Sequence, residues 1–386
     1  MSVLIRRGWL SLLLAAALVL TPTTAPLVAQ SSDNARYAAI VVDAETGEVL
    51  FARYADAQRF PASVTKIMTL YLAFEALAEG KAKLDDVVTV SAKAAREPPS
   101  KLGLAAGETI TLDNAMRATA VRSANDMAMA IAEHIGGSQE RFAVMATRKA
   151  RELGMTRTNY VNPNGLPDSR QVTSARDLAI LARAVMRDYP QYYRYFGLHD
   201  WVYNGREYHN TNGLLRGGNG YDGMKTGYTN ASGYNLAASS VRDGKRLITI
   251  VLGGRSTASR NAHVAALMDT GFDVERARAR GETIQIAQAF FESRGFGIGQ
   301  EPAGGIEYAS AATEDGAADP GSEGVAYTAL VAAQPQPLRV TPAPSEVRAA
   351  APVQRAEVPT TADLTATLNG GSAPATGRPA PPPARP

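Results

Sequence analysis

Hydrophobic and polar positions follow three successive patterns between residues 33 and 300. Two short β-rich runs, residues 37–42 and 48–54, flank turn-forming residues and predict a hairpin. Apolar residues then recur at helical spacing, which predicts helices over residues 63–78, 112–135 with a break at 122–125, 143–153, and 174–187. Further β-rich runs and one last helical pattern follow, at residues 223–229, 233–241, 245–252 and 261–270.

The order of these elements predicts an α+β fold. Strands at both ends of the domain would form one antiparallel β-sheet flanked by helices, and the central helices would form an all-helical lobe beside it. We place this domain at residues 33–275, followed by a short extension over residues 276–300.

Residues 1–30 are first basic and then apolar. Arg6 and Arg7 precede an apolar run from Trp9 to Leu20. That run is too short to cross a bilayer, which takes roughly 20 residues, but it has the layout of a secretory signal peptide. We therefore expect the chain to be exported.

Residues 301–386 have a different composition from the rest of the chain. They hold 14 of the 22 prolines and few large apolar side chains, so burial cannot offset their chain entropy and a disordered Pro/Ala-rich tail is predicted. The tail is acidic, with nine Asp/Glu against five Arg, which leaves 35 Lys/Arg against 28 Asp/Glu elsewhere. This basic balance suits an anionic surface. No Lys/Arg run with interleaved aromatics is present, so nucleic acid is not expected as a partner.

The composition also restricts the chemistry. The chain has no cysteine, which excludes thiol, disulfide and Cys–zinc chemistry. Its four histidines are scattered without an HExxH pattern, and we expect no metal and no cofactor. His209 lies in a polar run, and we interpret it as a surface hydrogen-bonding residue. No G-x-S-x-G motif occurs, which argues against an α/β-hydrolase triad.

A serine and a lysine open the first predicted helix. Ser63 and Lys66 are three residues apart, so they share one helix face and can contact each other. A lysine made neutral by burial or nearby positive charge can take the proton of a serine hydroxyl. Alternatively, Ser63 caps the helix and Lys66 is solvated, and this short pattern alone favours that second interpretation.

Two more short motifs carry polar side chains. Ser123 and Asn125 lie at the predicted break between two helices, where they could relay a proton and hold an amide, or simply cap the next helix. Lys225, Thr226 and Gly227 lie on the first late strand, where an exposed edge could bind an extended peptide that ends in a carboxylate. Taken singly, each motif favours the purely structural interpretation.

Together the three motifs are far more specific. In this order, at separations of 60 and 102 residues, they resemble penicillin-recognising serine enzymes, and most closely the low-molecular-mass penicillin-binding proteins that act as serine-type D-alanyl-D-alanine carboxypeptidases. The resemblance covers about residues 35–275 and implies a β-lactamase/transpeptidase-like fold. It rests on four strings, Pro61–Thr69, Val121–Ala128, Asn162–Pro167 and Gly223–Thr229.

The resemblance implies a two-step acyl transfer on peptidoglycan stem peptides that end in D-Ala-D-Ala. Ser63 would be the nucleophile and Lys66 its base, with Ser123 and Asn125 assisting proton transfer and holding the peptide. β-Lactam antibiotics would be covalent inhibitors, and the enzyme would work in the periplasm or on the outer face of the bacterial cytoplasmic membrane.

The resemblance also implies a set of substrate-binding residues. Lys225 would act electrostatically, Thr226 would meet the substrate carboxylate, and Gly227 would let the substrate approach. The backbone N–H groups of Ser63 and Tyr228 would form the oxyanion hole. Arg260 is matched to the family's carboxylate-binding arginine.

Two departures from the family pattern are visible. Ala124 replaces a glycine that this family usually has between the serine and the asparagine, which narrows the local backbone choices. After about residue 275 the chain shows neither the small β-domain nor the basic amphipathic helix frequent in the family, so the sequence leaves membrane attachment open.

Three alternative functions remain. A class A β-lactamase would use a glutamate in a loop after the Ser-x-Asn motif, and residues 162–168 contain none. A D,D-endopeptidase that cuts cross-links would share every motif. A catalytically inert wall-binding protein is the non-enzymatic alternative, and the presence of both Ser63 and Lys66 argues against it.

Overall fold

The computed structural model describes residues 34–296, so the predicted signal peptide and the predicted tail lie outside the described residues. One five-stranded antiparallel sheet has the order β2-β1-β9-β8-β7. Its strands are β1 (Ala38–Asp43), β2 (Val49–Arg53), β7 (Tyr221–Thr229), β8 (Gly233–Arg242) and β9 (Lys245–Gly254). The prediction of a sheet built from both ends of the domain is confirmed, and β7 is one of its two edges.

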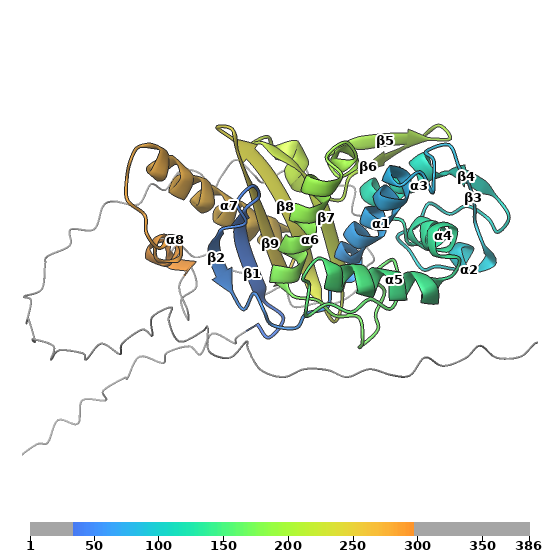
Figure 1. The fold of residues 1–386 in the computed structure, drawn as a ribbon, viewed down its shortest axis with the longest axis horizontal. Helices are drawn as coiled ribbons and strands as arrows, with labels where there is room; N and C mark the ends of the chain where they lie inside the picture. The colour runs from blue at the N-terminus through green and yellow to red at the C-terminus, as the bar shows by residue number, and fades with distance from the viewer. Residues whose placement is uncertain (1–33, 297–386) are drawn as a thin grey trace, which may run out of the picture. The chain divides into compact units, whose positions relative to one another are not determined.

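Both faces of this sheet are covered by helices (Figure 1). Side chains alternate between the faces along β1: Ile40 belongs to one hydrophobic core and Val41 to the other. The first core joins the sheet to α6 (Ala175–Asp188) and the helical lobe. The second core joins it to α7 (Thr257–Ala279) and α8 (Ala287–Phe291). Burial on both faces explains why the central strands are apolar almost throughout.

The helical lobe lies beside the sheet, as predicted (Figure 1). It contains α1 (Lys66–Ala78), α2 (Ala92–Ala95), α3 (Leu112–Val121), α4 (Asn125–Gly136) and α5 (Gln139–Glu152). The predicted break between α3 and α4 is present at residues 122–124. Gly137, at a φ of 78°, ends α4 in the left-handed conformation that glycine adopts without a Cβ clash. The Ser174 side chain accepts the Asp177 N–H and starts α6 at the position where the predicted helix over residues 174–187 begins.

Several elements differ from the prediction. The last helix, expected over residues 261–270, runs from Thr257 to Ala279, because a capping box between Ser256 and Ser259 starts it earlier. Two small hairpins were not predicted: β3 (Val87–Thr89) pairs with β4 (Thr109–Thr111), and β5 (Asp200–Tyr203) pairs with β6 (Arg206–His209). Short 3-10 and π turns complete the described chain: η1 (Ala62–Thr65), η2 (Tyr193–Tyr195), η3 (Gly213–Gly217) and η4 (Glu292–Phe296).

The extension after residue 275 is folded onto the sheet. Phe291 is fully buried and stacks on Phe51 of β2, with ring centroids 5.0 Å apart. Gln288 accepts a hydrogen bond from the Ala52 N–H at 3.0 Å, so α8 satisfies a donor on this edge of the sheet. No helix among residues 34–296 is long and apolar enough to cross a membrane.

Candidate active site

The predicted nucleophile lies at the junction of the sheet and the helical lobe. Ser63 is in the turn η1 rather than in the helix itself, and α1 begins at Lys66. The Ser63 side chain does not cap the helix, so the capping interpretation is wrong. The three-residue spacing nevertheless brings the two side chains together, with Lys66 Nζ 2.8 Å from Ser63 Oγ.

Lys66 has no exposed surface, although it is a lysine at the first position of a helix. Its Nζ atom donates to Asn125 Oδ1 at 2.7 Å and to the Asn164 backbone carbonyl at 2.6 Å. Burial, and next the positive charge of Lys225, lower the pKa of Lys66 well below its usual value, while Glu97 and Asp126 act in the opposite direction. The alternative of a solvated Lys66 is therefore wrong, and burial disfavours the charged form of its amine.

The break between α3 and α4 places the second motif. Ser123 is buried and has a φ of 62°, a left-handed conformation that is costly for a residue with a side chain. Ala124 has a φ of −61° and is the N-cap of α4, without a side-chain hydrogen bond, so an alanine is accommodated here without strain. The Ser123 hydroxyl has no hydrogen-bond partner within residues 34–296, whereas Asn125 contacts Lys66 directly.

The third motif lies on β7, which is an edge strand of the sheet as predicted, although its residues Lys225, Thr226 and Gly227 are buried rather than exposed. Lys225 is buried, and burial followed by the charge of Arg260 lowers its pKa to about 7. The Thr226 hydroxyl lies 2.7 Å from that of Thr211, which also accepts from Lys225 Nζ at 3.4 Å. Gly227 lies against the nucleophile, because a Cβ atom there would stand only 2.8 Å from Ser63 N. A lysine, two hydroxyls and the nucleophile thus come together around residues 225–227 of β7.

Tyr228 and Arg260 occupy different positions around this strand. Tyr228 is half exposed, its ring packs on Tyr234 at a centroid distance of 4.3 Å, and its hydroxyl donates to Asn230 Oδ1. Arg260 lies in the first turn of α7 and is buried, donating to the Asn235 carbonyl and to Asn261 Oδ1. Burial lowers the pKa of Arg260 to about 10. Its guanidinium donates to acceptors within the protein, and it affects the site because its positive charge lowers the pKa of Lys225.

Three residues that were not predicted as site residues support these groups: Asn235, Asn164 and Glu97. Asn235 of β8 donates from Nδ2 to the carbonyls of Phe60 and Pro61, which fixes the segment before Ser63 to the sheet. Asn164 supplies the carbonyl that accepts from Lys66, and its side-chain Nδ2 donates to Glu97 Oε2 at 2.9 Å. Asn164 lies in the string Asn162–Pro167, but any residue has a backbone carbonyl, so the residue type does not predict this acceptor.

Other polar clusters lie apart from the Ser63 site. Among residues 34–296, one exposed group could hold a metal, formed by Asp200, Glu207 and His209. His209 Nδ1 is 2.5 Å from Asp200 Oδ1, in line with the expected surface hydrogen bond. Asp200 Oδ1 also accepts from Arg216 at 2.7 Å, so this carboxylate is already neutralised.

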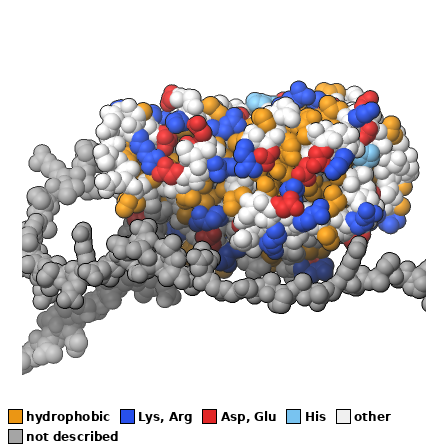
Figure 2. All heavy atoms as spheres, viewed as in Figure 1, with side chains coloured by type: hydrophobic (Ala, Val, Ile, Leu, Met, Phe, Trp, Pro, Cys, Tyr) orange, Lys and Arg blue, Asp and Glu red, His pale blue; other side chains and the backbone are white. Residues whose placement is uncertain are grey.

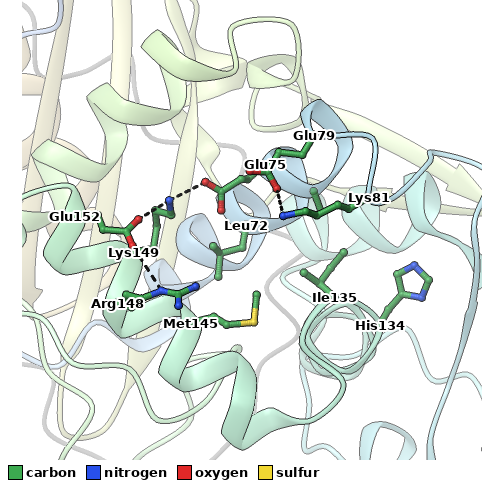
Figure 3. Close-up of a pocket in the computed structure, with 11 residues that line it drawn as sticks. Leu72, Glu75, Glu79, Lys81, His134, Ile135, Met145, Arg148, Lys149 and Glu152 are labelled. Atoms are coloured by element: carbon green, nitrogen blue, oxygen red, sulfur yellow. Dashed lines mark ion pairs between the residues drawn. The ribbon is translucent and has the colours of Figure 1, made fainter. Parts of the chain in front are cut away.

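A cavity of about 270 Å³ lies between α1, α4 and α5, and none of the predicted site residues lines it (Figure 3). Its charged side chains pair with one another: Lys149 lies 2.7 Å from both Glu75 and Glu152. On the face shown in Figure 2, acidic and basic side chains are likewise interspersed. The cavity therefore has no unpaired charge that could bind a substrate. The groups around Ser63 are the better candidate for an active site.

Comparison with known proteins supports a relationship over the same region. The family described as D-alanyl-D-alanine carboxypeptidase, Peptidase_S11, matches residues 25–256. The chain is 36% identical over 245 residues to the D-alanyl-D-alanine carboxypeptidase DacF of Bacillus subtilis, which covers 61% of each chain. It is also 36% identical over 240 residues to DacA of Escherichia coli K12, covering 60% of each. The match therefore spans less than two thirds of these relatives' own lengths.

Solved structures show the same fold. The structure of penicillin binding protein 5 from Haemophilus influenzae matches with a TM-score of 0.60 at 35% identity, over 61% of this chain and 70% of that one. Penicillin-binding protein D2 from Listeria monocytogenes, in its cefotaxime-bound form, matches with a TM-score of 0.56 at 29% identity, over 61% of this chain and 96% of that one. The predicted α+β, transpeptidase-like fold is confirmed.

Proposed function

The chain belongs to the D-alanyl-D-alanine carboxypeptidase family, and from that premise we propose that it removes the terminal D-alanine from peptidoglycan stem peptides through an acyl-enzyme on Ser63. The observation that carries this proposal is the contact between Ser63 Oγ and a buried Lys66 Nζ at 2.8 Å. A serine hydroxyl needs an adjacent base, and a lysine can be that base only where its environment favours the neutral amine.

In the acylation step, Ser63 Oγ attacks the carbonyl carbon between the two terminal D-alanines while Lys66 Nζ takes the hydroxyl proton. The negative charge that develops on the carbonyl oxygen is stabilised by the N–H groups of Ser63 and Tyr228. The C–N bond then breaks, and the departing amine receives a proton through Lys66 and the Ser123 hydroxyl. Free D-alanine leaves, and the rest of the peptide stays esterified to Ser63.

In the deacylation step, a water molecule attacks the ester carbonyl carbon and gives its proton to Lys66. The Ser63–carbonyl bond breaks, Ser63 regains its proton, and the shortened peptide leaves with a new carboxylate. Asn125 keeps its contact with Lys66 and holds the peptide amide. Every proton in this cycle is carried by side chains of the site, so the reaction requires neither a metal nor a cofactor.

β7 is an edge strand, and its position relative to Ser63 would determine in which direction the substrate peptide lies along it. If the terminal carboxylate meets Thr226 and Lys225, and the scissile carbonyl lies between Ser63 and Tyr228, the peptide runs antiparallel to β7. Residues upstream of the scissile bond then pass Tyr228 toward Asn230. Gly227 has no side chain to obstruct this approach. The charge of Arg260 keeps the site electropositive toward the carboxylate.

The same site bears on the alternative functions. A D,D-endopeptidase would use the identical groups on a cross-linked peptide, and only the substrate distinguishes the two activities. A β-lactamase would need fast deacylation, and residues 162–168 provide no glutamate for it. An inert wall-binding protein would gain nothing from a desolvated lysine, whose burial costs stability.

We infer the location and partners from the same premise. The N-terminal segment would direct export, so the enzyme would act on peptidoglycan in the periplasm or at the outer face of the cytoplasmic membrane of a bacterium. β-Lactams would bind as covalent inhibitors, because their ring carbonyl offers Ser63 an acyl group; the relative from Listeria monocytogenes was solved with cefotaxime and with ampicillin bound.

One experiment tests the proposal. Purified protein and its Ser63→Ala variant are incubated with a fluorescent penicillin and, separately, with a peptide ending in D-Ala-D-Ala. We expect labelling and D-alanine release by the wild type and neither by the variant. A wild type that does neither would exclude an acyl-enzyme mechanism, and rapid release of hydrolysed penicillin would identify a β-lactamase instead. A cross-linked muropeptide then separates carboxypeptidase from endopeptidase.

A further inference from the structure

The groups around Lys66 form a closed ring of hydrogen bonds. Lys66 Nζ donates to Asn125 Oδ1 at 2.7 Å and to the Asn164 carbonyl at 2.6 Å. Asn125 Nδ2 in turn donates to the Pro98 carbonyl at 2.8 Å, and Asn164 Nδ2 donates to Glu97 Oε2 at 2.9 Å. Glu97 and Pro98 are consecutive residues, so both arms of the ring end on the same short segment.

This ring has a direct consequence for the direction of the lysine lone pair. A neutral amine has two N–H donors and one lone pair. The two carbonyl oxygens of Asn125 and Asn164 can only accept, so they take both N–H groups. The remaining neighbour, Ser63 Oγ at 2.8 Å, then faces the lone pair and can donate its proton. Correct positions of the two carbonyls therefore make Lys66 a base toward Ser63 and toward no other group in the ring.

Glu97 holds one of these carbonyls in place. Asn164 has no exposed surface, and its side-chain donor has Glu97 as its hydrogen-bond partner within residues 34–296. Removing the carboxylate would leave a buried N–H unsatisfied. The Leu166 N–H, which donates to Asn164 Oδ1 at 3.3 Å, would still hold the side chain, but without Glu97 the side chain and the adjoining carbonyl are free to shift. The segment itself is anchored independently, because Ser100 accepts the Asn125 N–H through its carbonyl and donates from Oγ to the Arg122 carbonyl.

We propose that Glu97 is a positioning residue for acyl transfer: through Asn164 it fixes the acceptor that orients the Lys66 amine toward Ser63. The inference rests on the proposed acyl-transfer function. Glu97 has no hydrogen bond to Ser63 or Lys66, so its positioning effect passes through Asn164. No residue-type motif points to Glu97, because its effect passes through a backbone carbonyl of a different loop.

The charge of Glu97 has a second, separable effect. The charged groups that act on Lys66 are Lys225 on β7, which lowers its pKa, and Glu97 and Asp126, which raise it. Glu97 in turn is surrounded by Lys93, Lys66 and Asp126, and its burial raises its own pKa. Neutralising Glu97 without moving Asn164 should therefore lower the pKa of Lys66 and shift the acidic limb of the rate profile to lower pH.

Two variants of the full chain separate position from charge. In Glu97→Gln, the side-chain oxygen can still accept from Asn164, so geometry is kept and the negative charge is lost. In Glu97→Ala, both are lost. The measurements are the rate constant for labelling by a fluorescent penicillin as a function of pH, the rate of D-alanine release, and the melting temperature. Glu140→Ala serves as control, because Glu140 is exposed and pairs with the exposed Lys93.

Above the acidic limb, we expect Glu97→Ala to label at least about tenfold more slowly than the wild type, as small misplacements of catalytic groups do. Glu97→Gln should keep most of the rate, with its acidic limb at lower pH, and Glu140→Ala should match the wild type. If the wild type itself does not label, the proposed function fails. If the wild type labels and Glu97→Ala labels equally fast, the positioning role is wrong.

Two further outcomes also decide the matter. Normal labelling of both Glu97 variants combined with a long-lived acyl-enzyme would make Glu97 a deacylation base and overturn the positioning role. If Glu97→Ala does not fold, Glu97→Asp decides, because it keeps the charge but shortens the side chain that reaches Asn164: labelling at the wild-type rate overturns the positioning role.

Discussion

Gly227 lies directly against Ser63. A Cβ atom on Gly227 would stand 2.8 Å from the Ser63 nitrogen and 2.9 Å from the Val64 nitrogen, both backbone atoms that cannot rotate away. Gly165 approaches the same segment, since a Cβ there would stand 1.8 Å from the Ala62 carbonyl oxygen. Close backbone contact with two other parts of the chain thus positions the nucleophile. This contact is possible because Gly227 and Gly165 have no side chain.

This contact predicts that Gly227→Ala lowers the rate of acylation. The added methyl group must push β7 and the Ser63 turn apart, and a displacement of about 1 Å can cost on the order of 100-fold in rate. Gly217→Ala is the matched control, because a Cβ at Gly217 meets nothing within 4 Å. Labelling by fluorescent penicillin measures both variants. Equal labelling of Gly227→Ala and wild type would show that Ser63 is not held by this contact.

The two buried lysines predict a bell-shaped pH dependence of kcat/KM. Lys66 must be neutral to act as a base, so the rate rises with pH through its lowered pKa. Lys225 must be protonated to attract the substrate carboxylate, so the rate falls again near pH 7. A bound carboxylate raises the pKa of Lys225, so the alkaline limb of kcat should lie at higher pH than that of kcat/KM. A kcat/KM that keeps rising from pH 7 to 9 would contradict this assignment.

The same lysine makes stability depend on pH. Lys225 has a pKa of about 7 in the folded protein, against an ordinary value of about 10.4. Between these values the unfolded chain binds a proton that the folded chain does not, so the free energy of unfolding rises with pH. Relative to Lys225→Met, the wild type should gain up to about 1.4 kcal/mol per pH unit in this window. Urea unfolding at pH 7, 8 and 9 measures the difference, and a constant difference would rule the shift out.

Much of this architecture was predictable, because periodicity is strong where elements are long. The long, continuously buried strands β8 and β9 and the capped helix beginning after Ser174 are examples. The hairpins of three- and four-residue strands were missed, since so few residues cannot establish a period. The far end of α7 was missed because polar residues such as Arg276 interrupt the apolar pattern there.

The site was predictable only where residue type carries the chemistry. Lys66 contacts both Ser63 and Asn125, as expected, because the chemistry of a hydroxyl, an amine and an amide can be inferred from the residue type alone. The supporting groups could not be found in the same way. Asn164 acts through its backbone carbonyl, and the hydrogen bonds that link Glu97 to Lys66 pass through Asn164. Such contacts depend on how loops distant in sequence pack, which a pattern of residue types does not encode.

The folded extension leads to a final prediction about stability. Phe291 is fully buried against Phe51 and also packs beside Phe296, at a centroid distance of 6.0 Å. Truncating a buried phenylalanine leaves a cavity, so Phe291→Ala should lower the free energy of unfolding by about 3 to 5 kcal/mol. Ile286→Ala, at a side chain that is 66% exposed, should change it by less than about 0.5 kcal/mol. Chemical denaturation compares the two. If Phe291→Ala is as mild as Ile286→Ala, the extension does not share the core of the sheet.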